Sequence, residues 1–196
     1  MTGADEAALR RVVLVVALLN LAYFGIEFSV GVAIGSVSLF ADSVDFLEDA
    51  SVNLLIALAL GWSALARARL GMALAGILLV PALGMLWALW QKFAAPSAPE
   101  PFALSATGAG ALAVNLSCAL LLARFRNAGG SLMRAAFLSA RNDALANLAI
   151  IAAGLATAWS HSVWPDIVVG IGIAIMNIDA AREVWTAARG EHRAQA

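Results

Sequence analysis

Long apolar runs alternate with short polar breaks along the whole chain. A membrane-spanning helix needs roughly 20 mostly apolar residues. Gly, Ser, Pro and Arg residues gather between the runs, where turns are expected. The pattern therefore predicts an all-α integral membrane protein with six transmembrane helices. The predicted spans are residues 12–34, 38–60, 70–92, 102–124, 132–158 and 163–186.

Composition supports a membrane protein. Of the 196 residues, 62% are hydrophobic and 13% are charged, whereas soluble domains carry about 25% charged residues. The net charge of −1 gives no sign of a nucleic-acid partner. Cys118 is the only cysteine, which excludes a disulfide framework. The first apolar run is too long for the core of a cleavable signal peptide.

The basic residues predict the orientation of the helices. Arginine falls on one side of the predicted topology, and the opposite side holds only Lys92. By the positive-inside rule, both termini are expected in the cytoplasm. We expect residues 1–11 to be a cytoplasmic segment, 12–186 the transmembrane domain and 187–196 a short cytoplasmic tail. The arginines on the cytoplasmic side are Arg10, Arg11, Arg67, Arg69, Arg124, Arg126, Arg134, Arg182, Arg189 and Arg193.

The second predicted span contains four carboxylates in one eight-residue stretch: Asp42, Asp45, Glu48 and Asp49. A carboxylate at bilayer depth costs about 2.5–3.5 kcal/mol on insertion scales. Such groups face a protein interior or a water-filled cavity, and a cation or a proton compensates them. The second span is therefore a candidate ion pathway.

Helical spacing places these groups on defined faces. Asp42, Asp45 and Asp49 are three and four residues apart, so they share one face with Glu48 beside it. Two like charges one turn apart repel unless a cation joins them. This repulsion argues against a purely structural role for Asp45 and Asp49. Asp42 has a structural alternative as a hydrogen-bonding residue between helices.

The other predicted spans also carry polar residues. Ser139, Asp143 and Asn147 form a stripe at four-residue spacing in the fifth span. Polar residues in the first and fourth spans, which include Glu27, are interpreted as packing residues or as lining an access path. Arg141 is expected to be a counter-ion for a nearby acid. Three further predictions of this kind concern Asn20 and Asn115, as packing residues, and Asp166, as a helix-start carboxylate favoured by the helix dipole.

The chain resembles the cation diffusion facilitators, a family of zinc-type divalent metal transporters. The segment Asp45-Phe-Leu-Glu-Asp49 resembles the family's second-helix motif of an acid or His, three residues and Asp. The segment Ser139-Ala-Arg-Asn-Asp143-Ala-Leu resembles the fifth-helix motif, in which His usually stands first. The stretches from Asn20 to Asp42 and from Trp164 to Asp166 also resemble family helices.

The resemblance implies a six-helix transporter, usually a homodimer, that holds one ion between the second and fifth helices. Alternating access then exports the ion, generally in exchange for protons. Carried over to this chain, the ligands are Asp45, Asp49 and Asp143, with Ser139 in the fourth position. Zn²⁺ is the ion expected from the family, with Cd²⁺, Mn²⁺, Co²⁺ and Fe²⁺ as alternatives, and no prosthetic cofactor is expected.

Two departures from the family pattern stand out. Ser139 replaces the usual His, and a hydroxyl is a poorer zinc ligand than imidazole and better suited to harder ions. The domain organisation expected for this chain also lacks the family's cytoplasmic metal-binding domain. Any dimer is therefore expected to form through the transmembrane spans. The candidates for filling the vacant ligand position or serving as accessory groups are Asn142, Asn147, Glu48, Asp42 and Glu27.

Two alternatives to a metal exporter remain open at this level. One is a carrier for another cation, although only Phe46 and Phe137 could line an organic-cation site near the motifs. The other is a non-transporting membrane protein for metal sensing or assembly. An enzyme is not expected, because no nucleophile–base pair or HExxH motif is present. The Ala- and Arg-rich composition suggests a bacterial source and hence the inner membrane.

Overall fold

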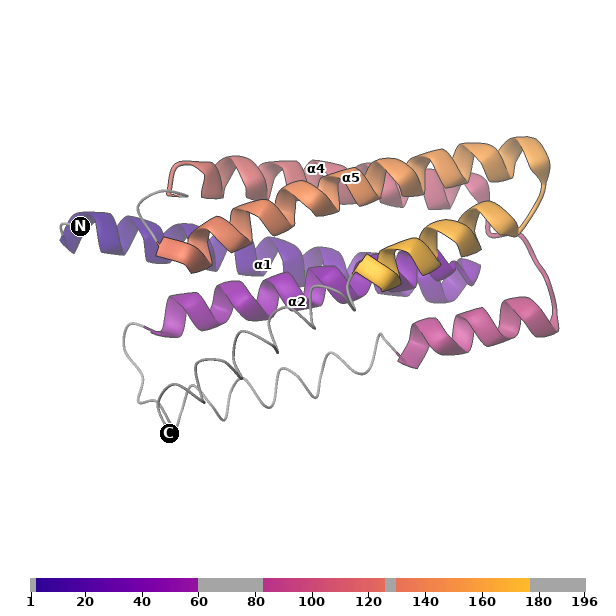
Figure 1. Ribbon diagram of the computed structural model, residues 1–196, viewed down its shortest axis with the longest axis horizontal. Coiled ribbons are helices and arrows are strands. Elements are labelled where there is room, and N and C mark those ends of the chain that lie inside the picture. Colours follow the sequence, from indigo (N-terminus) through magenta and orange to yellow (C-terminus); the bar gives the residue numbers. More distant parts are fainter. Residues whose placement is uncertain (1–2, 60–82, 126–129, 177–196) are drawn as a thin grey trace.

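The computed structural model describes residues 3–59, 83–125 and 130–176, which form six helical stretches (Figure 1). The predicted all-α fold with six helices is confirmed. The turn predicted between the spans 38–60 and 70–92 lies outside the described residues, as does most of the turn predicted between the spans 102–124 and 132–158. The helices are α1 (Gly3–Ile34), α2 (Val37–Ala59), a helix over residues 83–94, α4 (Pro101–Ala123), α5 (Gly130–Ser160) and a helix over Trp164–Met176.

The observed helix ends follow local chemistry. Gly35 adopts a φ of +62°, which permits the tight turn between α1 and α2. Glu100 caps α4, where its carboxylate accepts hydrogen bonds from the backbone N–H groups of Phe102 and Ala103. The first helix begins at Gly3, well before the predicted start of its span at residue 12.

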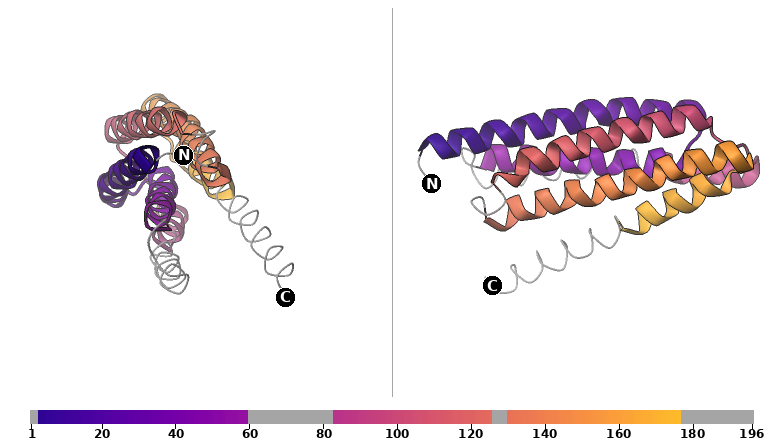
Figure 2. Two further views of the ribbon diagram at one scale, coloured as in Figure 1. Left: turned by 90° about the vertical axis from the view of Figure 1, so that its left-hand side faces the viewer. Right: turned by 90° about the horizontal axis from the view of Figure 1, so that it is seen from above.

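Four of the helices pack as a ring (Figure 2). Helix α1 contacts α2 and α4, and α5 contacts α4 and α2, so each helix has two neighbours. All four run along the long axis of the molecule in Figure 1. Side chains that point into the ring from any of the four helices can therefore meet.

Apolar clusters occupy both ends of this ring and leave a polar layer between them. The first lies toward the N-terminal end of α1, and the second lies toward the Gly35 turn. The first comprises Leu9, Val13, Val16, Ala57, Cys118, Ala119, Leu122, Ala136 and Ala140, and the second Leu39, Ala41, Leu104, Ala146, Ile150 and Ile173. Between them in sequence fall Asn20 and Glu27 of α1, Asp45 and Asp49 of α2, and Asp143 of α5.

Three helical segments of the described chain are long and apolar enough to cross a membrane: Ala7–Ile34, Pro101–Ala123 and Ser139–Ser160. Their outward faces carry large apolar side chains such as Leu120, which is 73% exposed. Helix α2 is absent from this set because its four carboxylates lower its hydropathy. It contacts α1 on one side and α5 on the other, so its neighbours supply much of the apolar surface that it lacks.

Candidate metal centre

The acidic face of α2 points into the ring. Asp42 is fully buried, Asp49 is 7% exposed and Asp45 is half-buried. Phe46, also on α2, is 2% exposed and packs against Tyr23 of α1, with the ring centroids 5.1 Å apart. The spacing of three and four residues therefore places the carboxylates on the interior face, as predicted from the sequence.

Residues of α5 meet this face. The Ser139 hydroxyl donates a hydrogen bond to Asp49 Oδ1 at 3.0 Å. The carboxyl groups of Asp49 and Asp143 lie within hydrogen-bonding reach of each other. Among the neighbouring carboxylates, Asp143 has the strongest electrostatic interaction with Asp45. The structure thus brings the four predicted ligands from α2 and α5 into one neighbourhood.

This neighbourhood is not a closed coordination shell. Across residues 3–59, 83–125 and 130–176, no three His, Cys, Asp or Glu side chains are gathered closely enough to hold a metal ion. The described histidine, His161, lies just beyond the end of α5 with a positive φ of 52°. A metal ion at this place would require the carboxylates to draw closer together.

Two of the accessory candidates lie at the edge of this neighbourhood. Asn142 is exposed on α5, and its side-chain oxygen accepts a 3.4 Å hydrogen bond from Arg141. Arg141 was expected to be a counter-ion for an acid, but the structure leaves it exposed beside Asn142. Glu48 is half-buried on α2, next to the acidic face.

The remaining candidates belong to a separate buried network. Asn115 of α4 donates to Asn147 Oδ1 at 2.9 Å, and Asn147 of α5 donates to Asp42 Oδ2 at 2.5 Å. Glu27 of α1 completes the network, with its carboxyl group within hydrogen-bonding reach of Asp42. These side chains are at most 2% exposed. The network connects all four helices of the ring, and Asn115 has the inter-helix bonding role predicted for it.

Several oxygens of this network have no hydrogen-bond donor. Both carboxylate oxygens of Glu27 and Asp42 Oδ1, and also Oδ1 of the neighbouring Asn20, are buried without a partner in the described part of the chain. Asn20 donates to the Val16 carbonyl at 3.1 Å and to Cys118 Sγ at 3.8 Å. A buried polar group without a partner is rare and calls for an explanation.

Asp166 lies outside both groups. It is fully buried, and its carboxylate accepts hydrogen bonds from the backbone N–H groups of Val37 and Ser38. The hydroxyls of Ser36 and Ser38 each donate to it at 2.6 Å. Asp166 lies in the first turn of the helix over Trp164–Met176, as predicted, but its observed hydrogen bonds cap the start of α2 instead. The sequence analysis did not single out these serines, although Ser before an apolar helix is a capping signal.

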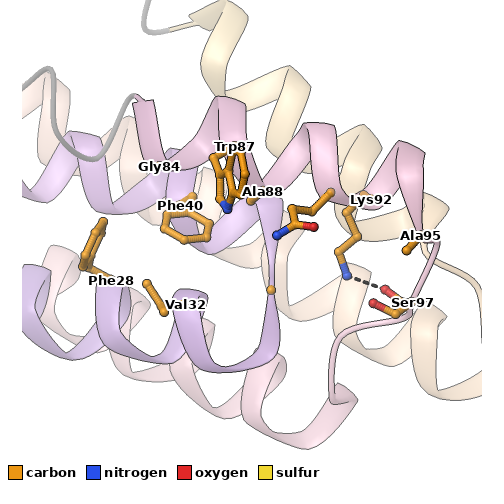
Figure 3. Close-up of a pocket in the computed structure, with 11 residues that line it drawn as sticks. Phe28, Val32, Phe40, Gly84, Trp87, Ala88, Lys92, Ala95 and Ser97 are labelled. Carbon is orange, nitrogen blue, oxygen red and sulfur yellow. Dashed lines mark hydrogen bonds between the residues drawn. The ribbon is translucent and has the colours of Figure 1, made fainter.

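A pocket of about 440 Å³ lies between α1, α2 and the helix over residues 83–94 (Figure 3). Its lining includes the aromatic side chains of Phe28, Phe40 and Trp87. Lys92 also lines it, and its ammonium group donates to the Ser97 carbonyl. None of the candidate metal ligands lines this pocket, and an ammonium group does not attract a metal cation.

Comparison with known protein families extends these observations. The family described as Cation efflux transmembrane domain matches residues 13–189. No curated protein matches the chain. The family match covers every helix described above except the first turns of α1.

Proposed function

Because the chain belongs to the cation diffusion facilitators, a family of multi-pass membrane proteins that export cations and are not enzymes, we propose that it exports a divalent metal ion through a site formed by four residues. The site comprises Asp45 and Asp49 of α2 and Ser139 and Asp143 of α5. Glu27, Asp42 and Asn147 are left out because they belong to the separate buried network.

The contact between Ser139 and Asp49 carries this proposal. A hydrogen bond of 3.0 Å joins α2 to α5 at the position where both family motifs fall. Asp143 lies one turn along α5 from Ser139, within reach of the same carboxylate. Carboxylate and hydroxyl oxygens from two facing helices are suitable ligands for a divalent cation.

The ligand types bear on which ion is carried. Zn²⁺ is the ion that we propose first, with Cd²⁺, Mn²⁺, Co²⁺ and Fe²⁺ as alternatives. An all-oxygen site discriminates less strongly in favour of zinc than a site with imidazole does. Replacement of His by Ser139 should therefore shift the preference toward harder ions such as Mn²⁺.

Charge balance supports exchange for protons. The negative charge of three carboxylates exceeds the positive charge of one divalent ion. Carboxylates crowded in a buried site also share protons once the metal leaves. We propose metal–proton antiport with both termini in the cytoplasm of a bacterial cell, in the inner membrane. We also propose that the protein forms a homodimer through its transmembrane helices.

Metal flux into proteoliposomes tests the function. Purified protein would be compared for Zn²⁺, Cd²⁺, Mn²⁺, Co²⁺ and Mg²⁺, with and without an imposed pH gradient. Asp49→Asn and Asp143→Asn should reduce flux to the level of empty liposomes. Glu100→Gln is the matched control, because it also removes one carboxylate charge but lies in the exposed cap of α4.

The outcomes separate the alternatives. Saturable flux that both site variants lose and Glu100→Gln keeps supports the assignment. Flux that ignores the pH gradient contradicts proton antiport. A folded protein that moves no metal favours a sensing or assembly role, and equal small effects of the three substitutions contradict the site.

A further inference from the structure

Glu27 and Asp42 form a buried pair between α1 and α2. Both side chains are fully buried, and their carboxyl groups lie within hydrogen-bonding reach of each other. A carboxylate can only accept hydrogen bonds, so two charged carboxylates at this distance repel and cannot bond. The pair becomes a hydrogen bond as soon as one proton lies between the two groups.

The surroundings supply almost no donor to this pair. Asn147 donates to one oxygen of Asp42, and the other three oxygens of the pair have no partner among the described residues. The Tyr23 hydroxyl lies on the same helix as Glu27 but donates to the Thr107 carbonyl at 2.6 Å. Three buried acceptor atoms of the pair therefore lack a donor among the described residues.

The neighbouring titratable groups are acidic. Tyr23 from α1, Asp45 and Asp49 from α2 and Asp143 from α5 interact electrostatically with Glu27 or Asp42. Of the groups that act most strongly on the pair, none is a cation. Removing a charge from water costs several kcal/mol, so two unneutralised carboxylates would be strongly unfavourable here.

The chemistry of the pair favours a proton over a metal ion. A divalent metal ion takes four or more ligands in proteins, and here the one polar neighbour bonded to the pair, Asn147, presents its amide N–H to Asp42. An N–H donor repels a metal cation. A proton needs only two acceptors, and a hydrogen bond between a carboxylic acid and a carboxylate is short and strong.

We propose that Glu27 and Asp42 form a proton-binding site, separate from the metal centre, that holds one proton between the two carboxyl groups. Asn147 connects this site to α5, where Asp143 lies one turn away. Movement of α5 when metal binds would change the Asn147–Asp42 hydrogen bond and release the proton. This release rests on the proposed function, whereas the proton site itself does not.

Infrared spectroscopy tests the site without any transport. Purified protein at neutral pH should show the carbonyl band of a buried carboxylic acid. Glu27→Gln and Asp42→Asn should each remove the intensity of one carboxylic acid, and Glu100→Gln should leave the band unchanged. Loss in either folded variant supports the site. A band whose intensity is unchanged in both variants, or that is absent from the wild type, overturns it.

Proton counting tests the release. Calorimetry of Zn²⁺ or Mn²⁺ binding in buffers of different ionisation enthalpy gives the number of protons released per bound ion. Glu27→Gln should release one proton fewer than the wild type at unchanged metal stoichiometry, and an equal count overturns the release. If neither ion binds to the wild type, the proposed function fails, while the infrared result still decides the proton site.

Discussion

Asp166 and Glu27 are both fully buried carboxylates in the same bundle, yet their surroundings are opposite. Asp166 accepts four hydrogen bonds from the N-terminal turn of α2. Glu27 accepts none from the described residues. Burial is equal in the two places, so burial alone does not reveal a carboxylate's role. The supply of donors separates a carboxylate that holds the fold from one that is available to a ligand.

The Asp166 region is fixed by several contacts that act together. Its carboxylate satisfies two backbone N–H groups that would otherwise have no partner at the start of α2. The negative charge also lies at the positive end of the α2 dipole. Among the described residues, the Glu27 and Asp42 pair has a single amide donor, on Asn147, and three of its oxygens lack a donor.

Removal of the Asp166 carboxylate should have the largest effect on stability. In Asp166→Ala, two backbone N–H groups and two hydroxyls lose their acceptor. Breaking such a buried charged network costs about 3–5 kcal/mol. For a chain of this length, that cost lowers Tm by about 6–20 °C. Thermal unfolding in detergent, followed by the folded fraction on size exclusion, measures the loss.

Two milder variants show whether the buried network is responsible. Asp166→Asn keeps one acceptor oxygen and should lose less stability than Asp166→Ala. Glu100→Ala removes the exposed cap of α4 and should cost less than about 1 kcal/mol. If Asp166→Ala lowers Tm no more than Glu100→Ala does, the structural role assigned to Asp166 is contradicted.

The packing beside Asp166 should be the next most sensitive. A Cβ added to Gly170 would lie 2.8 Å from the Ser38 nitrogen and from the Val37 carbonyl carbon. Backbone atoms cannot move aside easily, so Gly170→Ala should cost about 1–3 kcal/mol. Tm measured in detergent shows the effect.

Gly172 is the matched control for this substitution. It lies on the same helix, and a Cβ there would have no atom within 4 Å. Gly172→Ala should leave Tm unchanged or raise it, because Ala favours a helix by up to about 1 kcal/mol. Equal losses for the two alanine variants would mean that close contact with α2 is unimportant.

The smallest effect on stability is expected at Glu27. Glu27→Gln keeps the shape of the side chain and adds an N–H donor that can reach Asp42. Stability should stay within about 1 kcal/mol of the wild type or rise, since this N–H can replace the shared proton as the donor to Asp42. Tm near pH 7 provides the measurement. A loss as large as that of Asp166→Ala would assign Glu27 a structural role instead.

The sequence predicted the features that depend on local patterns. Apolar runs predicted the helices, and the break between the spans 12–34 and 38–60 predicted the turn at which Gly35 adopts a positive φ. The spacing of Asp42, Asp45 and Asp49 predicted a shared interior face. The family motifs also placed Ser139 beside the α2 acids, where the structure finds its hydrogen bond to Asp49.

The sequence could not predict partners on distant helices. Asp166 precedes an apolar run, which suggests a cap for its own helix, but its partners lie about 130 residues earlier in the chain. Asn115, Asn147 and Asp42 have no shared spacing that predicts their chain of hydrogen bonds. Helix rotation decides which residues face inward, and for this reason Arg141 lies exposed beside Asn142.

The tight turn at Gly35 has a consequence for the insertion of the newly made chain into the membrane. Helix α2 carries four acids, each costing about 2.5–3.5 kcal/mol at bilayer depth, so it enters lipid poorly by itself. Its predecessor α1 is strongly apolar and contacts it directly. A turn at Gly35 and Ser36 lets the two helices leave the translocation machinery as one hairpin. The acidic helix would then enter the bilayer already paired with α1, before the fifth helix has been synthesised.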